Sequence, residues 1–195
     1  MQENIYAAPE ANLATATGSS VEPAFYVVSP VKFLMLYFFT FSFYGLYWHY
    51  KNWSQYKIFY RDSEPMPIMR AIFSIFFTHG LFSVIDMRIK DQQRDYSWNP
   101  TVWATIGVIA LLGARLIDRF TASGSMSEPI EFVPFPLIIV YGIVLLKAQC
   151  AINMSCNDPG GKSNSNFTLA NCAWIFFGTI FYCLTLIGLF LLDDF

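Results

Sequence analysis

Four carboxamide side chains form the most regular polar pattern in the sequence. Gln149, Asn153 and Asn157 follow one another at intervals of four residues. Asn171 stands at the start of the next apolar segment. Residues four apart lie on one face of a helix, where carboxamides inside a membrane hydrogen-bond to neighbouring helices at roughly 0.6 kcal/mol per contact. The pattern therefore predicts a polar face between helices, with a lined pathway or a ligand site as the alternative.

A second polar pattern lies earlier in the chain. Its members stand at positions i, i+4, i+7 and i+11, the spacing of one narrow helix face: His79, Ser83, Asp86 and Lys90. The residues between them are largely apolar, so the segment predicts an amphipathic helix that is embedded at its start and emerges toward Lys90. This stripe and the carboxamide face are the two features that favour a solute pathway.

Neither catalysis nor metal binding is predicted. His49 and His79 lie on separate segments, and the cysteines at positions 150, 156, 172 and 183 lack the spacings of zinc and redox motifs. No cluster of carboxylates accompanies either histidine. We therefore expect no catalytic residue, no metal ligand, no cofactor and no enzymatic activity. Cys156 and Cys172 flank one loop, and they can form a disulfide only if that loop faces an oxidising compartment.

Composition indicates the medium in which these groups lie. Hydrophobic residues make up 55% of the 195 residues, charged residues only 13%, and the mean hydropathy is +0.41. Soluble domains carry about 25% charged residues, so this chain has too few to cover its apolar surface in water. The net charge of -2 gives no reason to expect nucleic acid as a partner. The expected partner is the lipid bilayer.

The apolar segments predict an all-α, polytopic membrane helix bundle. Residues 1–24 are polar and small and predict a flexible N-terminal tail, whereas 25–195 form one transmembrane domain. Four helices are expected to cross, and 68–90 is either embedded or a fifth crossing helix. Asn99 is the expected N-cap of the helix that begins at Pro100. The expected spans are 30–50, 68–90, 100–120, 132–156 and 170–192.

The stretch 25–53, which contains the first expected span, 30–50, is the segment around which the chain is organised. Pro30 suits the first turn of a helix, where its missing N–H is not needed. The far end of the segment carries the aromatic and basic residues that are typical of a membrane interface. The expected interfacial anchors are Tyr47, Trp48, Lys51 and Trp53.

Basic residues orient the predicted bundle. If 68–90 is embedded, only Arg115 and Arg119 fall on one side, and Asp118 is expected to pair with Arg115. The opposite side then holds Lys51, Lys57, Arg61, Arg70, Arg88, Lys90, Arg94 and Lys162. If 68–90 crosses, the division is almost even. Because Lys and Arg accumulate on the cytoplasmic side, charge favours four crossings, with the N-terminus outside and the loop between Cys156 and Cys172 inside.

An aromatic signature covers the first predicted helix and its flanks: FYVVSPxKFLxLY, followed by YxLYWxYKNW. It is carried by Phe25, Tyr26, Ser29, Pro30, Lys32, Phe33, Tyr44, Tyr47, Trp48, Tyr50, Lys51, Asn52 and Trp53. Further matching positions are Gln149, Ala151, Ile152, Asn153, Asn157, Asn166, Phe167, Thr168 and Asn171. With these residues the chain resembles a family of uncharacterised bacterial inner-membrane proteins, a domain of unknown function. The resemblance implies a multi-pass protein of the bacterial inner membrane, and it brings no activity, substrate or catalytic residue.

These observations favour a non-enzymatic integral membrane protein that is structural or binds a partner. The expected partner besides lipid is another protein or a second copy of the chain, and one version is an immunity protein against a membrane-targeting toxin. Ionisable residues lie at helix ends, whereas pumps and carriers place them near the midplane. The alternative is a small transporter or channel that uses the face of Gln149, Asn153 and Asn157. An enzyme acting on lipids comes third, because no nucleophile–base pair supports it.

Overall fold

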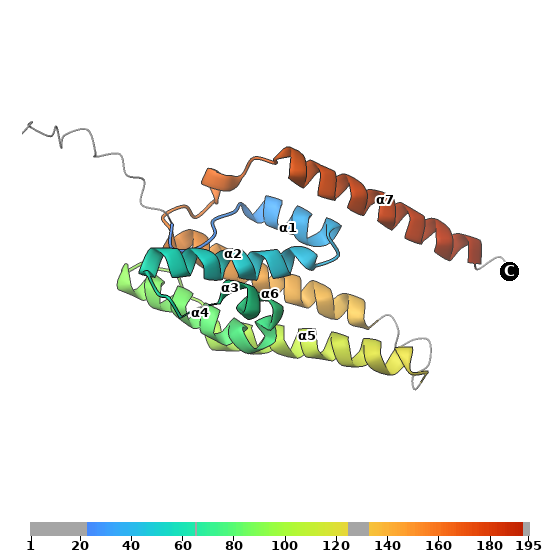
Figure 1. The fold of residues 1–195 in the computed structure, drawn as a ribbon, viewed down its shortest axis with the longest axis horizontal. Coiled ribbons are helices and arrows are strands. Elements are labelled where there is room, and N and C mark those ends of the chain that lie inside the picture. The colour runs from blue at the N-terminus through green and yellow to red at the C-terminus, as the bar shows by residue number, and fades with distance from the viewer. Residues whose placement is uncertain (1–22, 65, 125–132, 193–195) are drawn as a thin grey trace, which may run out of the picture.

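The computed structural model describes residues 23–64, 66–124 and 133–192 (Figure 1). The predicted tail, 1–24, lies outside the described residues apart from Pro23 and Ala24. Every regular element in the described ranges is helical: α1 (Pro30–Phe39), α2 (Phe43–Tyr60), α3 (Pro67–Ile72), α4 (Ser74–Asp91), α5 (Pro100–Ala122), α6 (Pro134–Ser155), η3 (Lys162–Asn164) and α7 (Leu169–Leu192). The predicted all-α class is confirmed.

Three of these helices, α5, α6 and α7, are long and apolar enough to cross a membrane. They correspond to three of the predicted spans. The 22 residues of α6 measure about 33 Å, which matches a hydrocarbon core of about 30 Å. The start of α5 is capped as expected, because the Asn99 side chain accepts the Val102 N–H at 3.0 Å and Pro100 occupies the first turn. The chain is an all-helical protein with three candidate membrane-spanning helices among the described residues.

The predicted span 30–50 is not one helix. The chain reverses between α1 and α2, and α2 returns toward the end of the bundle at which α1 began (Figure 1). With 10 residues, α1 is about 15 Å long, too short to cross a hydrocarbon core of about 30 Å. The prediction of one continuous helix over 30–50 was wrong. The two helices form a helical hairpin instead.

Residues between the two helices explain the reversal. Phe41 and Ser42 have φ angles of 52° and 66°, in the left-handed region that residues other than glycine rarely adopt. The Thr40 hydroxyl donates to the Leu36 carbonyl at 2.7 Å and accepts the Tyr44 N–H at 2.9 Å. One side chain therefore satisfies backbone groups at the end of α1 and at the start of α2. The hydrophobic pattern runs through this turn without a break and could not reveal it.

The predicted helix 68–90 is also divided. Phe73 separates α3 from α4, and α4 ends beside the end of α2 (Figure 1). Arg88, in the last turn of α4, donates to the Tyr60 hydroxyl at 3.2 Å and so joins the two helix ends. The chain therefore leaves α2 and comes back to the same end of the bundle, and neither α3 nor α4 is among the helices that are long and apolar enough to cross a membrane.

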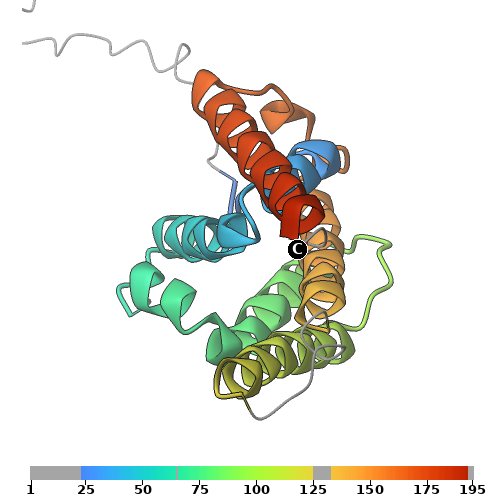
Figure 2. The same cartoon turned by 90° about the vertical axis from the view of Figure 1, so that its right-hand side faces the viewer.

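The bundle has two ends of different character. We call one the anchored end: α2, α4 and α6 finish there, α5 and α7 begin there, and residues 25–29 are held there. We call the other the hollow end: α5 finishes there, α6 begins there, and the α1–α2 turn lies on that side. Viewed from the hollow end, α1 to α6 are arranged around a ring (Figure 2). The start of the described chain and the α2–α3 connection therefore lie at the same end of the bundle. The sequence predicted that they lie on opposite sides of the membrane.

Helix α7 stands outside the ring (Figure 2). It packs against α1, where the Tyr182 ring stacks on Phe38 with centroids 4.9 Å apart and the Tyr182 hydroxyl donates to the Phe38 carbonyl at 3.1 Å. A Cβ at Gly178 would collide with the Phe39 carbonyl, so glycine permits this close approach. Only 6% of the spanning residues of α7 are buried, against 44% for α6. Most of α7 therefore faces outward.

Candidate functional site

The most extensive polar site surrounds an extended segment, Phe25–Ser29, at the anchored end. Phe25 and Val28 are fully buried, although the segment is neither helix nor strand. Buried backbone N–H and C=O groups outside regular structure need partners from elsewhere in the protein, most of all inside a membrane. These partners come from α2, from α6 and from the loop between α6 and α7.

Carboxamides of α6 and α2 bind this backbone. Gln149 donates to the Tyr26 carbonyl at 3.1 Å, and Asn153 donates to the Val28 carbonyl at 3.0 Å. From α2, Asn52 accepts the Tyr26 N–H at 3.0 Å. The predicted polar face of α6 therefore does make contacts between elements, and its partner is the extended segment.

The two α6 carboxamides also bind each other and a tryptophan. The side-chain nitrogen of Gln149 donates to the Asn153 oxygen at 2.7 Å, and the Gln149 oxygen accepts Trp48 Nε1–H at 2.5 Å. Gln149 and Asn153 are both 0% exposed. Gln149 thus uses both of its N–H groups and its oxygen inside the protein. A pathway needs polar groups that can exchange partners with a solute, and these groups are already engaged.

The structure places Asn157 and Asn171 elsewhere. Asn157 follows the end of α6 with a φ of 63°, and its exposed side chain accepts a hydrogen bond from Arg94. Asn171 caps α7, since its side chain accepts the Thr168 N–H at 3.1 Å and its own N–H donates to the Thr168 hydroxyl at 3.3 Å. The predicted face therefore keeps two of its four members, because α6 ends before the third.

The loop before α7 closes over the extended segment. The Asn164 side chain donates to the Val27 carbonyl at 2.9 Å. The Lys32 ammonium donates to the Asn164 side-chain oxygen at 2.7 Å and to the Asn166 carbonyl at 2.6 Å. Lys32 is only 3% exposed, so its charge is held inside the protein.

Two residues shape this loop. Asp158 accepts the backbone N–H groups of Ser163 at 2.8 Å and Lys162 at 2.9 Å, and these hydrogen bonds, that of Ser163 foremost, lower the pKa of its carboxyl. Gly161 has a φ of 61° and lies against Val28, where a Cβ would collide with the carbonyl oxygen. The loop conformation therefore requires glycine at this position.

The polar stripe predicted on α4 contacts α5 and the connection between α4 and α5. Its members are His79, Ser83, Asp86 and Lys90. Asp86 forms an ion pair with Lys90 at 2.7 Å and accepts Trp98 Nε1–H at 3.0 Å. His79 Nε2 lies 3.1 Å from the Thr105 hydroxyl of α5, and the serine is exposed. These contacts join α4 to α5 and to the connection between them.

Two of the four expected interfacial anchors are core residues. Trp48 and Trp53 are 0% and 2% exposed, because α2 turns these rings inward. Tyr47 is 46% exposed, as an interfacial residue would be. Lys51 is half-buried, with its Nζ 5.7 Å from the centre of the Tyr26 ring. The prediction fails for the tryptophans because the hairpin packs them into the protein.

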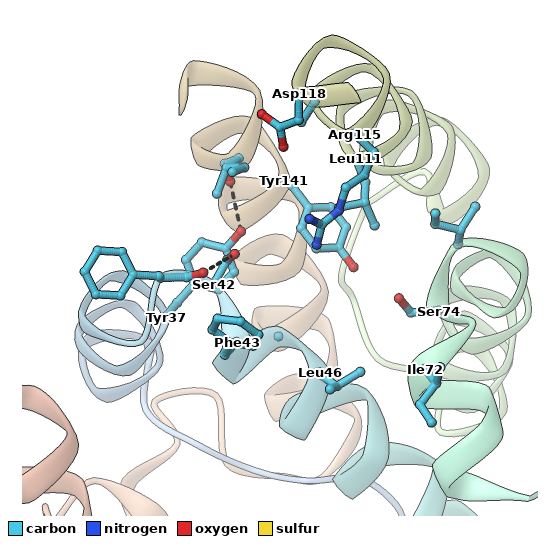
Figure 3. A pocket seen from close by; sticks show the side chains of 15 residues that line it. Tyr37, Ser42, Phe43, Leu46, Ile72, Ser74, Leu111, Arg115, Asp118 and Tyr141 are labelled. Carbon is cyan, nitrogen blue, oxygen red and sulfur yellow. Dashed lines mark hydrogen bonds between the residues drawn. The ribbon is translucent and has the colours of Figure 1, made fainter. Parts of the chain in front are cut away.

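A cavity of about 330 Å³ lies within the ring at the hollow end (Figure 3). Its polar lining consists of Tyr37, Ser42, Ser74, Arg115, Asp118 and Tyr141. Arg115 extends into the cavity toward Tyr141 (Figure 3). The predicted pair of Arg115 with Asp118 does not form, since the one ion pair among the described residues lies within α4. A guanidinium, a carboxylate and four hydroxyls thus line one space.

A buried histidine lies behind the cavity wall. His49 is 1% exposed, and its Nε2 lies 3.0 Å from the Tyr141 hydroxyl. Its Nδ1 has no hydrogen-bond partner among the described residues. The Tyr37 hydroxyl donates to the Ile138 carbonyl at 2.9 Å and fixes α1 to α6. The groups facing the cavity can hydrogen-bond a small polar solute.

The sequence did not predict this cavity because its lining comes from helix breaks. Ser42 ends the turn before α2, and Ser74 begins α4 after the Phe73 break. Neither break contains glycine or proline, the usual markers of a turn. Thr40 and Ser42, two hydroxyl residues in an otherwise aromatic run, are the signal that could have marked the first break.

The remaining candidate groups add no site. All four cysteines are free thiols, so Cys156 and Cys172 do not form a disulfide. Within the described ranges, no group of three or more His, Cys, Asp or Glu side chains could hold a metal ion. No family model, curated protein or solved structure matches this chain. The resemblance to a family of bacterial inner-membrane proteins therefore stays a prediction.

Proposed function

We propose that the protein is a non-enzymatic integral membrane protein that binds a second membrane protein, and that α7 is the helix which the partner contacts. Two observations support this proposal. The carboxamides of Gln149 and Asn153 at the anchored end are engaged in holding the fold, which leaves the transporter alternative without its predicted pathway. The observation that carries the proposal is the exposure of α7.

Helix α7 has 24 residues, and α1 is its principal neighbour. Its exposed large side chains include Phe176, Phe177, Phe181 and Leu184. Aromatic residues are enriched in the contact surfaces between proteins. Helices in a membrane associate through close packing, so a helix with one neighbour can gain contacts from a second. Helices α5 and α6 already pack against each other. The surface for a partner is therefore more readily provided by α7.

We further propose three crossings, by α5, α6 and α7, with the anchored end in the cytoplasm. Lys57 lies in the last turn of α2, Arg88 and Lys90 lie in the last turn of α4, and Lys162 lies in η3, all at this end. Arg119 lies in the last turn of α5, at the hollow end. This distribution follows the positive-inside rule. Location in a bacterial inner membrane rests on the family resemblance.

Reporter fusions test the orientation. Because the hairpin returns to its starting side, we expect a fluorescent protein fused at the N-terminus to fluoresce and a phosphatase fused there to be inactive. A phosphatase fused after residue 195 serves as the control and should be active, since α7 carries the chain to the opposite end. Phosphatase activity at the N-terminus would restore a first crossing helix and contradict the proposed topology.

In-membrane photocrosslinking tests the partner. A photoreactive phenylalanine analogue at Phe177, 63% exposed on α7, should give an adduct of discrete mass. Placing it at Ile109, 64% exposed on α5, is the matched control and should give lipid adducts only. The adduct mass distinguishes a second copy of the chain from another protein. Lipid adducts alone at both positions would show that α7 is covered by lipid, and discrete adducts at both would show that α7 is not the preferred surface; either result would remove the proposal.

A small-solute transporter is the second candidate, and the hollow-end cavity favours it. Arg115 and Asp118 are unpaired there, so a polar solute could bind between them. Liposomes containing the purified protein should then take up a labelled zwitterionic solute, and Arg115→Leu should abolish uptake. Absence of flux in wild-type liposomes would eliminate this candidate.

A further inference from the structure

A second cavity lies outside the ring, between α7 and the α1–α2 hairpin. This groove has a volume of about 470 Å³, within the range of about 300–1,000 Å³ that is typical of ligand sites. Near the α6–α7 loop its lining is polar: Lys32, Asn164, Thr168 and Asn171. Farther along the hairpin and α7 it includes Leu36, Phe43 and Trp174. The groove therefore has a polar end and an apolar end.

Lys32 places an uncompensated positive charge in this groove. Its buried ammonium donates to two neutral oxygens, those of the Asn164 side chain and the Asn166 backbone. No carboxylate pairs with it among the described residues, where the one ion pair lies in α4. Burying an ammonium without an opposite charge is costly, and an ammonium has three N–H groups. One N–H and the net charge are left for a ligand.

A second buried group of the groove, the Tyr44 hydroxyl, lacks a hydrogen-bond partner among the described residues. The Tyr44 hydroxyl lies near that of Tyr26 but makes no hydrogen bond of normal geometry, although Tyr44 is only 7% exposed. Buried hydroxyls are nearly always hydrogen-bonded. Two buried donors, one of them charged, thus line the same groove. Both would be satisfied by the oxygens of an anion.

We propose that this groove binds a glycerophospholipid, with its anionic phosphate at Lys32 and an acyl chain along the apolar part beside Trp174. Lys32 is the one charged residue in the lining. A net negative headgroup therefore meets no carboxylate in the groove. The lipid would also fill the space between α7 and the hairpin, two elements that otherwise meet mainly through α1.

The position of the groove favours a lipid over a free anion. Lys32 contacts the loop that immediately precedes α7, which is the level of the headgroups if α7 crosses the bilayer. From there the groove continues beside α7 toward the hydrocarbon core. A free phosphate would occupy only the polar end. This inference is independent of the proposed protein partner, because the groove lies on the side of α7 that faces the hairpin.

The test compares substitutions in the purified full chain, in dodecyl maltoside after delipidation. Ala170 is exposed on α7 and lines the groove, so Ala170→Phe fills the groove without disturbing the core. Ala173→Phe, also exposed on α7 but outside the lining, is the matched control. Lys32→Met keeps the apolar stem and removes the charge. The measurements are the Tm on titration with phosphatidylglycerol and bound lipid by native mass spectrometry.

We expect phosphatidylglycerol to raise the Tm of the wild type and of Ala173→Phe, and to leave that of Ala170→Phe unchanged. Lys32→Met should bind about tenfold more weakly, the effect of one charged hydrogen bond. If Lys32→Met does not fold, the Ala170 and Ala173 pair still decides. An equal rise for Ala170→Phe would overturn the proposal. So would an equal rise of the wild-type Tm with inorganic phosphate, because the anion alone would then suffice.

Discussion

The two ends of the bundle use polar residues in opposite ways. At the anchored end, Gln149 and Asn153 are fully buried and bind the Phe25–Ser29 backbone, each other and a tryptophan. At the hollow end, Arg115 extends into a cavity without an ion-pair partner, and the nearby turn holds two residues in left-handed conformations. The carboxamides of the anchored end are therefore fixed parts of the structure. At the hollow end, some polar groups remain available to a ligand.

This difference shows why a polar pattern alone does not locate a functional site. The regular spacing of the α6 carboxamides serves an irregular backbone segment, which cannot satisfy its own N–H and C=O groups in a membrane. The groups that remain available, Arg115, Asp118 and Ser74, follow no shared spacing. We therefore expect substitutions of the anchored-end carboxamides to reduce stability, and substitutions of the charged residues that line the hollow-end cavity to affect binding.

Gln149→Leu is expected to have the largest effect. It leaves the Trp48 N–H, the Tyr26 carbonyl and one Asn153 hydrogen bond without their partner, and should lower the free energy of unfolding by about 3 kcal/mol. Arg115→Leu, at the hollow end, should change it by no more than about 0.5 kcal/mol. Both values can be measured by denaturant titration in detergent. Equal losses would contradict the contrast between the two ends.

Gly161→Ala is expected to have the second largest effect, a loss of about 2 kcal/mol in the free energy of unfolding. The added methyl group would collide with the Val28 carbonyl in a backbone conformation that favours glycine. Gly160→Ala is the matched control, because a Cβ there meets only the flexible Lys162 side chain and should cost less than about 0.5 kcal/mol. If the two neighbours respond alike, the loop does not hold the extended segment. Thermal unfolding of both variants supplies the measurement.

Much of the fold could be predicted from the sequence, because long apolar helices are defined by local composition. The spans of α5, α6 and α7 and the Asn99 cap were found in this way. The hydrophobic pattern did not reveal the α1–α2 hairpin, because its turn depends on the Thr40 side chain and on left-handed residues within a continuous apolar run. Missing that turn also placed the start of the described chain and the α2–α3 connection at opposite ends of the bundle.

The candidate sites were less predictable, for a related reason. The α6 periodicity correctly joined Gln149 and Asn153, but their partner, Phe25–Ser29, lies more than one hundred residues away in the sequence. The two cavities arise where helix breaks or a separate helix leave space. Local periodicity contains no information about such distant contacts. Trp48 and Trp53 were assigned to the interface because their inward orientation depends on the hairpin.

Tyr141→Phe is a substitution at the hollow end with a smaller expected effect on stability. It removes the hydroxyl that lies 3.0 Å from His49 Nε2 and leaves the buried imidazole without that partner. We expect a loss of about 1 kcal/mol in the free energy of unfolding. Tyr50→Phe, at a residue 38% exposed, should cause no measurable loss. A Tyr141→Phe protein as stable as the wild type would mean that His49 finds another partner, and that this end is more adaptable than its geometry indicates.

Ser42→Gly has the smallest expected effect and the opposite sign. Ser42 has a φ of 66°, a conformation that costs a residue with a Cβ about 1–2 kcal/mol, whereas glycine adopts it freely but loses about 0.5–1 kcal/mol of chain entropy. The net result should be a gain of about 0.5 kcal/mol in the free energy of unfolding. Ser42→Ala keeps the strain and removes the same hydroxyl, so it should show no gain. If both variants lose stability equally, the hydroxyl and not the backbone matters, and the hollow end stores no strain at its turn.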